Sequence, residues 1–314
     1  MTTKSNVAFV FPGQGSQKIG MLANVAAKYP LIEETFAKAS EALGYDMWQL
    51  VQEGEQADIN FTEKTQPILL TASVALWRLW LQQGGAKPSL MAGHSLGEFT
   101  ALVCAGSLDF ADAVRLVRAR GQFMQTAVPV GVGAMAAIIG LDDEVINSIC
   151  VEASQGECVQ AVNYNSPGQV VIAGKVSAVD RAIEKLKEAG AKRALPLPVS
   201  APFHTDLMRP AGEKLQQELA SITILQPEIP VVHNVHAKTE SDVERIRDLL
   251  VQQIYSPVKW VSCVEAMVSK GIDTTVECGP GKVLSGLNKR IDKSLSCMAI
   301  EEEQAFLDAL AALK

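Results

Sequence analysis

The segment at residues 89–99 restricts the fold and chemistry of this chain more than any other. Residues 90–92 are apolar and predict a short buried strand, the turn Gly93-His94-Ser95-Leu96-Gly97 follows, and small residues then predict a helix. A nucleophile elbow has this order, because its serine sits at a strained turn and the glycines let the backbone pack closely. The pattern also fits an ordinary turn between strand and helix, but the flanking elements favour Ser95 as a nucleophile.

Composition limits the other functions that the chain could have. With 314 residues, 48% of them hydrophobic and 20% charged, there is material for one large domain or two ordinary ones. A formal net charge of −7 argues against a nucleic-acid-binding protein, which would carry a basic surplus. The six cysteines are scattered without a Cys-x-x-Cys pair, so we expect free thiols in a reducing compartment and no metal site.

The sequence predicts neither a signal peptide nor a membrane span. The apolar run at residues 7–11 is interrupted by Pro12-Gly13 before it reaches the length of a signal sequence. The most apolar long segment, residues 68–81, carries Thr71, Ser73 and Arg78, which is typical of a buried helix. We therefore expect a cytoplasmic protein that does not associate with membranes.

The first part of the chain has the alternating order of an α/β protein with a parallel sheet. A strand is expected at residues 7–11 and helices at 31–43, 68–81 and 109–126, with Gln66-Pro67 in the first positions of the second helix. After residue 204 we expect helices at 206–221, 242–254 and 258–270 and strands at 230–235 and 274–278.

Residues 129–199 are predicted to form a small domain inserted into the larger one. Strands are expected at 134–139, 159–163, 169–173 and 193–197, helices at 142–154 and 177–189, and a turn at 165–168. The order β-α-β-β-α-β is the ferredoxin-like pattern. The predicted fold is thus a hydrolase-like α/β domain, residues 1–128 and 200–314, with a ferredoxin-like insertion.

Two glycine-rich turns, at residues 12–17 and 279–282, raise the alternative of a non-catalytic nucleotide-binding module. Neither turn completes a P-loop or a Gly-x-Gly-x-x-Gly motif, which weakens that interpretation. The first turn is either a plain tight turn or a means of bringing Gln14 to the top of the sheet as an oxyanion or substrate donor.

A serine hydroxyl needs a base to take its proton, and the chain has four histidines. His94 adjoins Ser95 in a sharp turn where neighbouring side chains diverge, so it is more suited to lining the site. His233 and His236 follow a strand, where a surface or core-edge role is usual. His204 lies on a proline-rich loop where the chain re-enters the large domain, and we favour it over His233.

A serine esterase or thioesterase is the second hypothesis for this elbow. α/β-Hydrolases carry the serine, an acidic residue and then a late histidine, but no histidine follows His236. This absence favours a dyad of Ser95 and His204 in which a backbone carbonyl orients the imidazole.

Several motifs together resemble one family. They are Phe11-Pro12-Gly13-Gln14-Gly15-Ser16-Gln17, Gly93-His94-Ser95-Leu96-Gly97-Glu98-Phe99, Arg120, Asn163-Tyr164-Asn165-Ser166-Pro167-Gly168 and Pro202-Phe203-His204. The chain is similar to the malonyl-CoA:acyl carrier protein transacylases of bacterial type II fatty-acid synthesis, nearly end to end. The resemblance implies ping-pong transfer of malonyl from coenzyme A to the carrier's phosphopantetheine thiol, with no cofactor and no metal, by a monomer.

The resemblance also implies a role for individual residues. Ser95 would be the nucleophile and His204 the base, oriented by the main-chain carbonyl near Gln253. The remaining assignments are oxyanion amides from Gln14 and Leu96, a malonyl carboxylate receptor at Arg120, an acyl pocket lined by His94 and Met124, and Asn165 on the coenzyme A side. A guanidinium suits the receptor role because it can hold a carboxylate through two parallel hydrogen bonds.

Two positions refine the expectation. Phe99 stands where many family members have tyrosine, which affects only packing. Phe203, before the histidine, resembles the malonyl-preferring pattern and implies a tight pocket that disfavours an added α-methyl group.

Acyl carrier proteins are acidic, and so is this chain overall, so docking requires a local basic patch. The candidates are Lys192 and Arg193 on the small domain and Lys289 and Arg290 near the C-terminal loop, with Lys185, Lys187 and Lys282 nearby in sequence. A solvated charged face is the alternative explanation for any one of these side chains.

Overall fold

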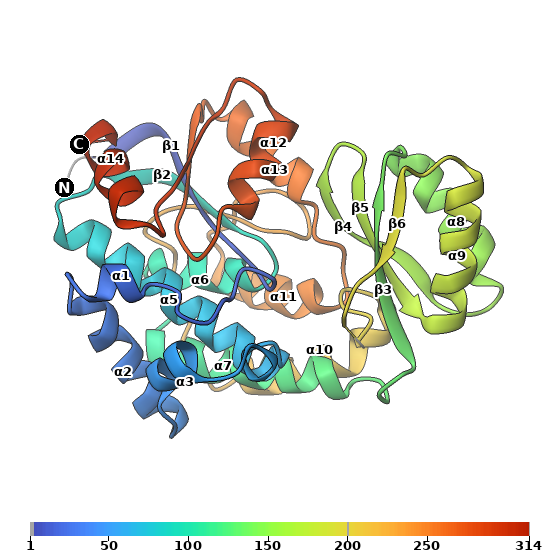
Figure 1. Ribbon diagram of the computed structural model, residues 1–314, viewed down its shortest axis with the longest axis horizontal. Helices are drawn as coiled ribbons and strands as arrows, with labels where there is room; N and C mark the ends of the chain where they lie inside the picture. The colour runs from blue at the N-terminus through green and yellow to red at the C-terminus, as the bar shows by residue number, and fades with distance from the viewer. Residues whose placement is uncertain (1–2, 200, 314) are drawn as a thin grey trace.

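The computed structural model describes residues 3–199 and 201–313, and five parallel strands form its larger sheet (Figure 1). The strand order is β7-β2-β1-β8-β9. The strands are β1 (Thr3–Phe11), β2 (Lys87–Gly93), β7 (Val231–Val232), β8 (Thr274–Glu277) and β9 (Ser296–Ala299). The predicted parallel α/β sheet is therefore confirmed, and β2 leads directly into the serine turn.

Alternate side chains of β1 enter two different hydrophobic clusters, because successive residues of a strand face opposite sides of the sheet. Phe9 packs edge-on against Trp77 and Trp80, with both ring-centroid distances 5.2 Å. Ala8 and Val10 belong to the cluster on the opposite face. Both faces are thus covered, as a parallel sheet requires.

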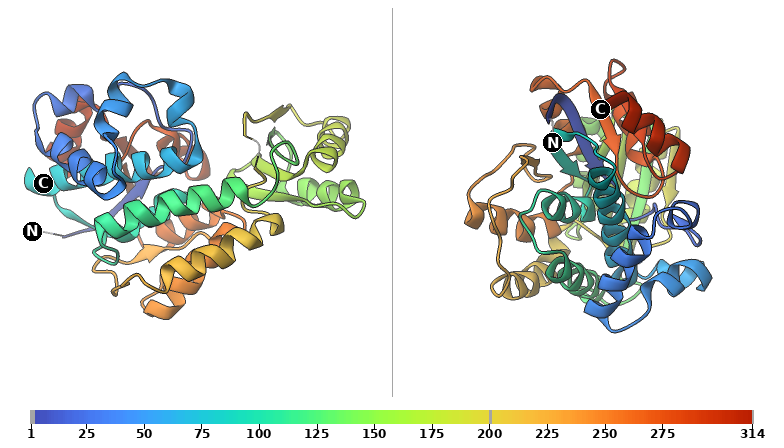
Figure 2. Two further views of the ribbon diagram at one scale, coloured as in Figure 1. Left: turned by 90° about the horizontal axis from the view of Figure 1, so that it is seen from below. Right: turned by 90° about the vertical axis from the view of Figure 1, so that its left-hand side faces the viewer.

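Helices supply the cover of both faces (Figures 1 and 2). The helices of the N-terminal part are α1 (Ala23–Ala26), α2 (Leu31–Leu43), α3 (Met47–Glu53), α4 (Gln56–Ile59), α5 (Thr62–Gln82), α6 (Leu96–Cys104) and α7 (Phe110–Thr126). The later ones are the 3₁₀ turn η1 (Asp206–Met208), α10 (Arg209–Leu219), α11 (Val243–Ile254), α12 (Trp260–Ser269), α13 (Val283–Ile291) and α14 (Glu303–Leu313). Buried residues of α2, α5, α7 and α10 share the cluster of Phe9, whereas α12 and α13 pack against Ala8 and Val10.

The second sheet has four antiparallel strands in the order β4-β5-β3-β6, which confirms the predicted ferredoxin-like arrangement. Its strands are β3 (Gly133–Ile139), β4 (Val159–Ser166), β5 (Gln169–Lys175) and β6 (Arg193–Pro196). Helices α8 (Asp143–Ser154) and α9 (Val176–Glu188) bury one face of it with a cluster of its own. Figure 1 shows both helices on the side away from the larger sheet.

Backbone hydrogen bonds join the small sheet to the rest of the protein at Val258. Its N–H donates to Val162 O at 2.8 Å, and its carbonyl accepts from Tyr164 N–H at 3.0 Å. Strand β4 also packs against α12 and α13. The division into domains at residues 129 and 199 stays a prediction, and Ser200, on the predicted loop, lies outside the described residues.

The helix expected at 68–81 begins earlier, at Thr62, so Pro67 lies inside it rather than in its first positions. Polar residues at its start are buried, so the first turns lack the apolar periodicity by which a helix is predicted. Thr65 Oγ1 donates to Ile59 O, and Gln66 is 2% exposed. The proposed position of Pro67 was therefore wrong.

Other boundaries also differ from the prediction; strand β1, for example, begins at Thr3 instead of residue 7. The strand expected at 230–235 is only Val231–Val232, because the chain turns back where His233 N–H donates to Lys238 O. Strand β4 extends to Ser166, which pairs with Gln169 of β5, and Asn165 lies at a register shift within the strand instead of in the turn. The helix expected at 206–221 is divided into η1 and α10.

No helix in the described ranges combines the length and the apolar character needed to cross a bilayer.

Candidate active site

Ser95 occupies a strained turn between β2 and α6, with φ 51° and ψ −106°. Positive φ is uncommon for a residue other than glycine and is often found at functional sites. The flanking glycines are required by close backbone contacts: a Cβ on Gly93 would lie 1.9 Å from Gly97 C, and one on Gly97 would lie 2.0 Å from Phe11 O. The local geometry is that of a nucleophile elbow.

His204 contacts the serine directly. Its Nε2 lies 2.8 Å from Ser95 Oγ, and its Nδ1 lies 2.8 Å from the main-chain oxygen of Gln253. Since a carbonyl can only accept, Nδ1 carries the proton, which leaves Nε2 to accept from the serine hydroxyl. Burial, together with the positive charge of Arg120, lowers the pKa of His204 to about 3, so the ring is neutral at pH 7.

Arg120 lies beside the same serine rather than in solvent, although arginines near the end of a helix are usually solvated. It is 1% exposed, and Nη2 donates to Ser95 Oγ at 3.1 Å and to Gln253 Oε1 at 2.8 Å. Nη1 donates to Gln66 Oε1 at 2.7 Å, while Nε has no partner within the described residues. The guanidinium carbon lies 5.1 Å from the Phe99 ring centroid, so this phenylalanine packs against the cation.

The charge of Arg120 persists despite its burial. Burial lowers the pKa of the guanidinium to about 10, and the negative charge of Glu98 acts in the opposite direction. Among the described residues Arg120 forms no salt bridge. A buried cation with only neutral hydrogen-bond partners is suited to an incoming carboxylate.

Two backbone amides remain open near the serine. Leu96 is the first residue of α6, and neither its N–H nor that of Gln14 has a hydrogen-bond partner within the described part of the chain. The Gln14 side chain is held by Thr62, whose hydroxyl donates to Gln14 Oε1 at 3.0 Å. Free amides at a helix start can stabilise a negatively charged oxygen.

These groups surround one cavity of about 540 Å³. Its lining includes the serine, the histidine and Arg120 together with Gln14, Leu96, His94, Met124 and Phe203. His94 Nε2 lies 2.8 Å from Asn165 Oδ1, which places Asn165 directly behind the cavity wall. Of the predicted site residues outside the basic patch, the structure thus brings all to this cavity or to a side chain that lines it.

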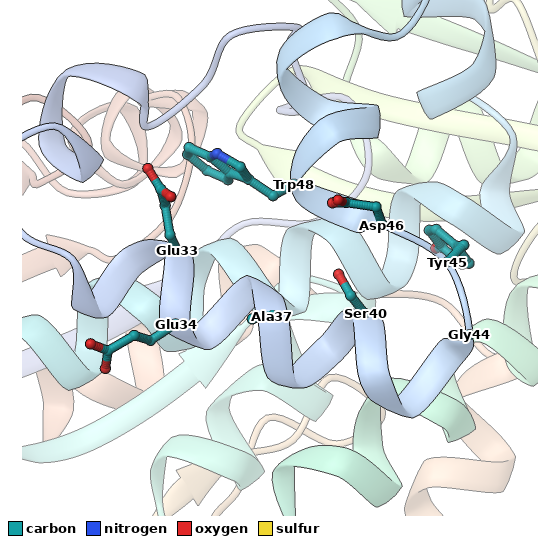
Figure 3. A pocket seen from close by; sticks show the side chains of 8 residues that line it. All are labelled: Glu33, Glu34, Ala37, Ser40, Gly44, Tyr45, Asp46 and Trp48. Carbon is teal, nitrogen blue, oxygen red and sulfur yellow. The ribbon is translucent and has the colours of Figure 1, made fainter.

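A second cavity, of about 640 Å³, lies between α2 and the chain leading into α3 (Figure 3). Figure 3 shows Glu33, Glu34 and Asp46 around it, with Trp48 on one side. Its lining contains no histidine, and the Ser40 hydroxyl is already donated to Phe36 O. This cavity therefore has no activated nucleophile.

Sequence reasoning missed four supports of the site: Glu98, Asn234, Gln66 and the side chain of Gln253. Glu98 belongs to the elbow motif, but no role was assigned to it. The expected surface or core-edge position of His233 was also wrong in part: the ring is fully buried, and its Nδ1 lies 2.7 Å from Glu98 Oε1. The only feature of the sequence that could have indicated a role for Glu98 is that it is a charged residue in an otherwise apolar helix.

The structure brings the two halves of the predicted basic patch to one end of the small sheet. Ile139 pairs with both Gln169 and Arg193, and Arg290 Nη1 donates to Gln169 Oε1 at 2.9 Å. Lys289, on α13, donates to the backbone carbonyls of Lys293 and Leu295, which follow that helix. Lys192 and Arg193 are exposed, without an ion pair in the described residues.

The described residues contain no group of three or more histidine, cysteine, aspartate or glutamate side chains placed to hold a metal. All six cysteines are free thiols. Burial raises the pKa of Cys104 and Cys278, so both thiols stay protonated.

The site combines a strained serine in contact with a neutral histidine, on a parallel α/β sheet with a ferredoxin-like insertion. Residues 8–300 match the family model described as acyl transferase domain, which places the chain in the acyl transferase class. The malonyl CoA-acyl carrier protein transacylase of Escherichia coli K12 is 61% identical over 303 residues, which is 96% of this chain and 98% of that protein. The chain belongs to the malonyl-CoA:acyl carrier protein transacylase family.

Solved structures agree with this assignment. The crystal structure of the malonyl-CoA:acyl carrier protein transacylase of Xanthomonas oryzae superposes with a TM-score of 0.98 at 53% identity, covering 100% of this chain and 99% of that one. A malonyl-transacylase in complex with a type II PKS acyl-carrier protein gives 0.97 at 55% identity, covering 98% and 100%. The predicted fold is thus confirmed over essentially the whole chain.

Proposed function

We propose that this protein transfers a malonyl group from malonyl-CoA to the phosphopantetheine thiol of acyl carrier protein, through an ester on Ser95, in fatty acid synthesis. Family membership supports the reaction. The observation that carries the chemistry is the contact of Ser95 Oγ with both His204 Nε2 and Arg120 Nη2.

In the first half-reaction, Ser95 Oγ attacks the thioester carbon while its proton passes to His204 Nε2. The carbonyl oxygen becomes negatively charged and is stabilised by the free amides of Gln14 and Leu96. The carbon–sulfur bond then breaks, and His204 returns the proton to the sulfur of coenzyme A. The products are malonyl-Ser95 and free coenzyme A.

The second half-reaction is the reverse with another thiol. The carrier's thiol gives its proton to His204 as its sulfur attacks the ester carbon. Ser95 Oγ leaves and recovers the proton from His204, which restores the starting enzyme. The carbonyl of Gln253 keeps a proton on His204 Nδ1 throughout, because a carbonyl oxygen can only accept a hydrogen bond.

Arg120 selects the donor in this proposal. The malonyl carboxylate would take the open Nε and a neighbouring amino group, forming the paired, charge-assisted hydrogen bonds that guanidinium groups make. Binding of that anion would also offset the positive charge that lowers the pKa of His204. Met124 and Phe203 then limit the space around the α-carbon.

The carrier protein would dock where Lys192, Arg193 and Arg290 share one end of the small sheet. Asn165, which supports His94, precedes the β4 residue that pairs with Gln169, so this end of the sheet adjoins the cavity. We also propose that the protein works in the cytoplasm, where its free cysteines stay reduced.

Mass spectrometry after incubation with malonyl-CoA tests the proposal. We expect an adduct of one malonyl group on Ser95, absent from Ser95→Ala, that is discharged by added carrier protein. A protein that only binds nucleotides would give no adduct, and an esterase would release free malonate without needing the carrier thiol.

A further inference from the structure

Glu98 is a fully buried carboxylate one turn after the serine. Its Oε1 lies 2.7 Å from His233 Nδ1. Its Oε2 accepts from the backbone N–H of Asn234 and from Gln253 Nε2, both at 2.9 Å. The carboxylate does not line the cavity, so it does not contact substrate directly.

The Asn234 contact leads to the backbone of the elbow. Asn234 Oδ1 accepts from Ser95 N–H at 2.8 Å, and Asn234 Nδ2 donates to Gly93 O at 2.7 Å. These two hydrogen bonds clamp the residues on either side of His94. Glu98 fixes the backbone from which that clamp extends.

The Gln253 contact leads to the remaining groups around the serine. Gln253 Nε2 also donates to Ser95 O at 3.0 Å, and Gln253 Oε1 accepts from Arg120 Nη2 at 2.8 Å. Its main-chain oxygen accepts from His204 Nδ1. One glutamine thus touches the nucleophile, the cation and the base.

We propose that Glu98 is a positioning residue that fixes the orientation of the Gln253 amide. Glu98 Oε2 accepts from the Asn234 N–H and from Gln253 Nε2, so it holds the Gln253 amino group towards itself. Oε1 must then face Arg120, which only donates. Reversing the amide would set two acceptors against each other at Glu98 and two donors against each other at Arg120.

His233 completes this arrangement without acting as a second base. Its Nδ1 faces the carboxylate, while Nε2 is buried with no partner in the described residues. The ring does not line the cavity. Its role is to occupy the second carboxylate oxygen, which leaves Oε2 for Asn234 and Gln253.

This inference rests on the proposed acyl transfer through Ser95, and the test separates the two. Single-turnover acylation by malonyl-CoA gives two quantities: the fraction of sites that become malonylated and the rate constant. We expect Glu98→Gln to lower the rate constant on the order of 10²-fold, as small misplacements of reacting groups do. The malonylated fraction should stay close to one.

Glu277→Gln is the matched control. Glu277 is also a buried glutamate, and it accepts from the backbone N–H groups of Leu284 and Ser285 at the start of α13, outside the cavity. This variant should lose stability but keep the wild-type rate constant. If Glu98→Gln instead lowers only the malonylated fraction, Glu98 is structural and the inference is wrong.

Glu98→Asp covers the case in which the glutamine variant does not fold. It keeps the carboxyl group, but the shorter side chain cannot hold both Asn234 and Gln253, so we expect the rate constant to fall at least about tenfold. A rate constant within twofold of wild type would overturn the inference. If wild-type protein forms no adduct on Ser95, the proposed function fails before Glu98 is tested.

A double-mutant cycle tests whether Glu98 acts on the reaction through Gln253. If Glu98 acts through Gln253, Glu98→Gln combined with Gln253→Met should be no slower than Gln253→Met alone. Additive losses would show that Glu98 does not act through this amide.

Discussion

Arg120 and Ser95, 25 positions apart in sequence, meet at 3.1 Å between Nη2 and Oγ. The cation is therefore close enough to hold the far end of a short diacid while the serine attacks the near end. Because the guanidinium has neutral partners only, a bound carboxylate would be its first ionic partner. In the proposed reaction, the position of this one charge would favour malonyl over acetyl donors.

Arg120→Gln should reduce acylation of Ser95 by malonyl-CoA about 10- to 100-fold, the value of one or two charge-assisted hydrogen bonds. Acylation by acetyl-CoA, which has no free carboxylate, should persist or rise. Arg118→Gln is the control, since Arg118 lies on the same helix but donates to Leu43 O, outside the cavity. Equal losses with both donors would make Arg120 a structural residue.

The pH dependence of acylation should reflect a base that is hard to protonate. With the pKa of His204 lowered to about 3 in the free enzyme, kcat/KM for malonyl-CoA should stay level from pH 8 to about pH 5 instead of falling to half near pH 6.5. Arg120→Gln removes one cause of that lowering, so its acid limb should move to higher pH. An acid limb near 6.5 in the wild-type protein would contradict this prediction.

The same shift affects stability in acid. Since the pKa of His204 is lower folded than unfolded, its contribution is complete above about pH 6.5 and is lost as pH falls from 6.5 towards 3. The slope from one such group is at most about 1.4 kcal/mol per pH unit. The free energy of unfolding, measured with urea at several pH values, should depend less steeply on pH in His204→Asn than in the wild-type protein.

Gly97→Ala should destabilise the protein by about 2 to 4 kcal/mol, because its Cβ would overlap Phe11 O and force β1 and α6 apart. Gly286→Ala, on α13, is the control, since a Cβ there meets no atom within 4 Å. Thermal unfolding followed by circular dichroism would measure both. Equal midpoints would show that the elbow tolerates the added methyl group.

Reversing Lys192 and Arg193 to glutamate should raise the Michaelis constant for acyl carrier protein several-fold and leave that for malonyl-CoA unchanged. The effect should shrink with added salt, because exposed charges are screened. Reversing Lys38 and Lys270 makes the same charge change away from that end of the small sheet and should have no effect. An unchanged carrier constant would remove the patch from the docking proposal.

Much of the fold was predictable because local periodicity determined it. The α2 helix was predicted with its observed ends, and the alternation of strands and helices between residues 134 and 197 gave the small sheet. The start of α5 was not predictable in this way, because Thr65 and Gln66 are polar residues that become buried through contacts specific to this fold.

The sequence by itself determined the elbow: Gly93, Ser95 and Gly97 are neighbours in the chain, and their strain and spacing follow from local geometry. Tertiary structure decided what surrounds it. Glu98 reaches Gln253 across 155 positions and Asn234 across 136, and no local pattern records such contacts. These donors and acceptors pair only after the chain has packed. They must pair there, because a buried polar group without a hydrogen-bond partner costs free energy.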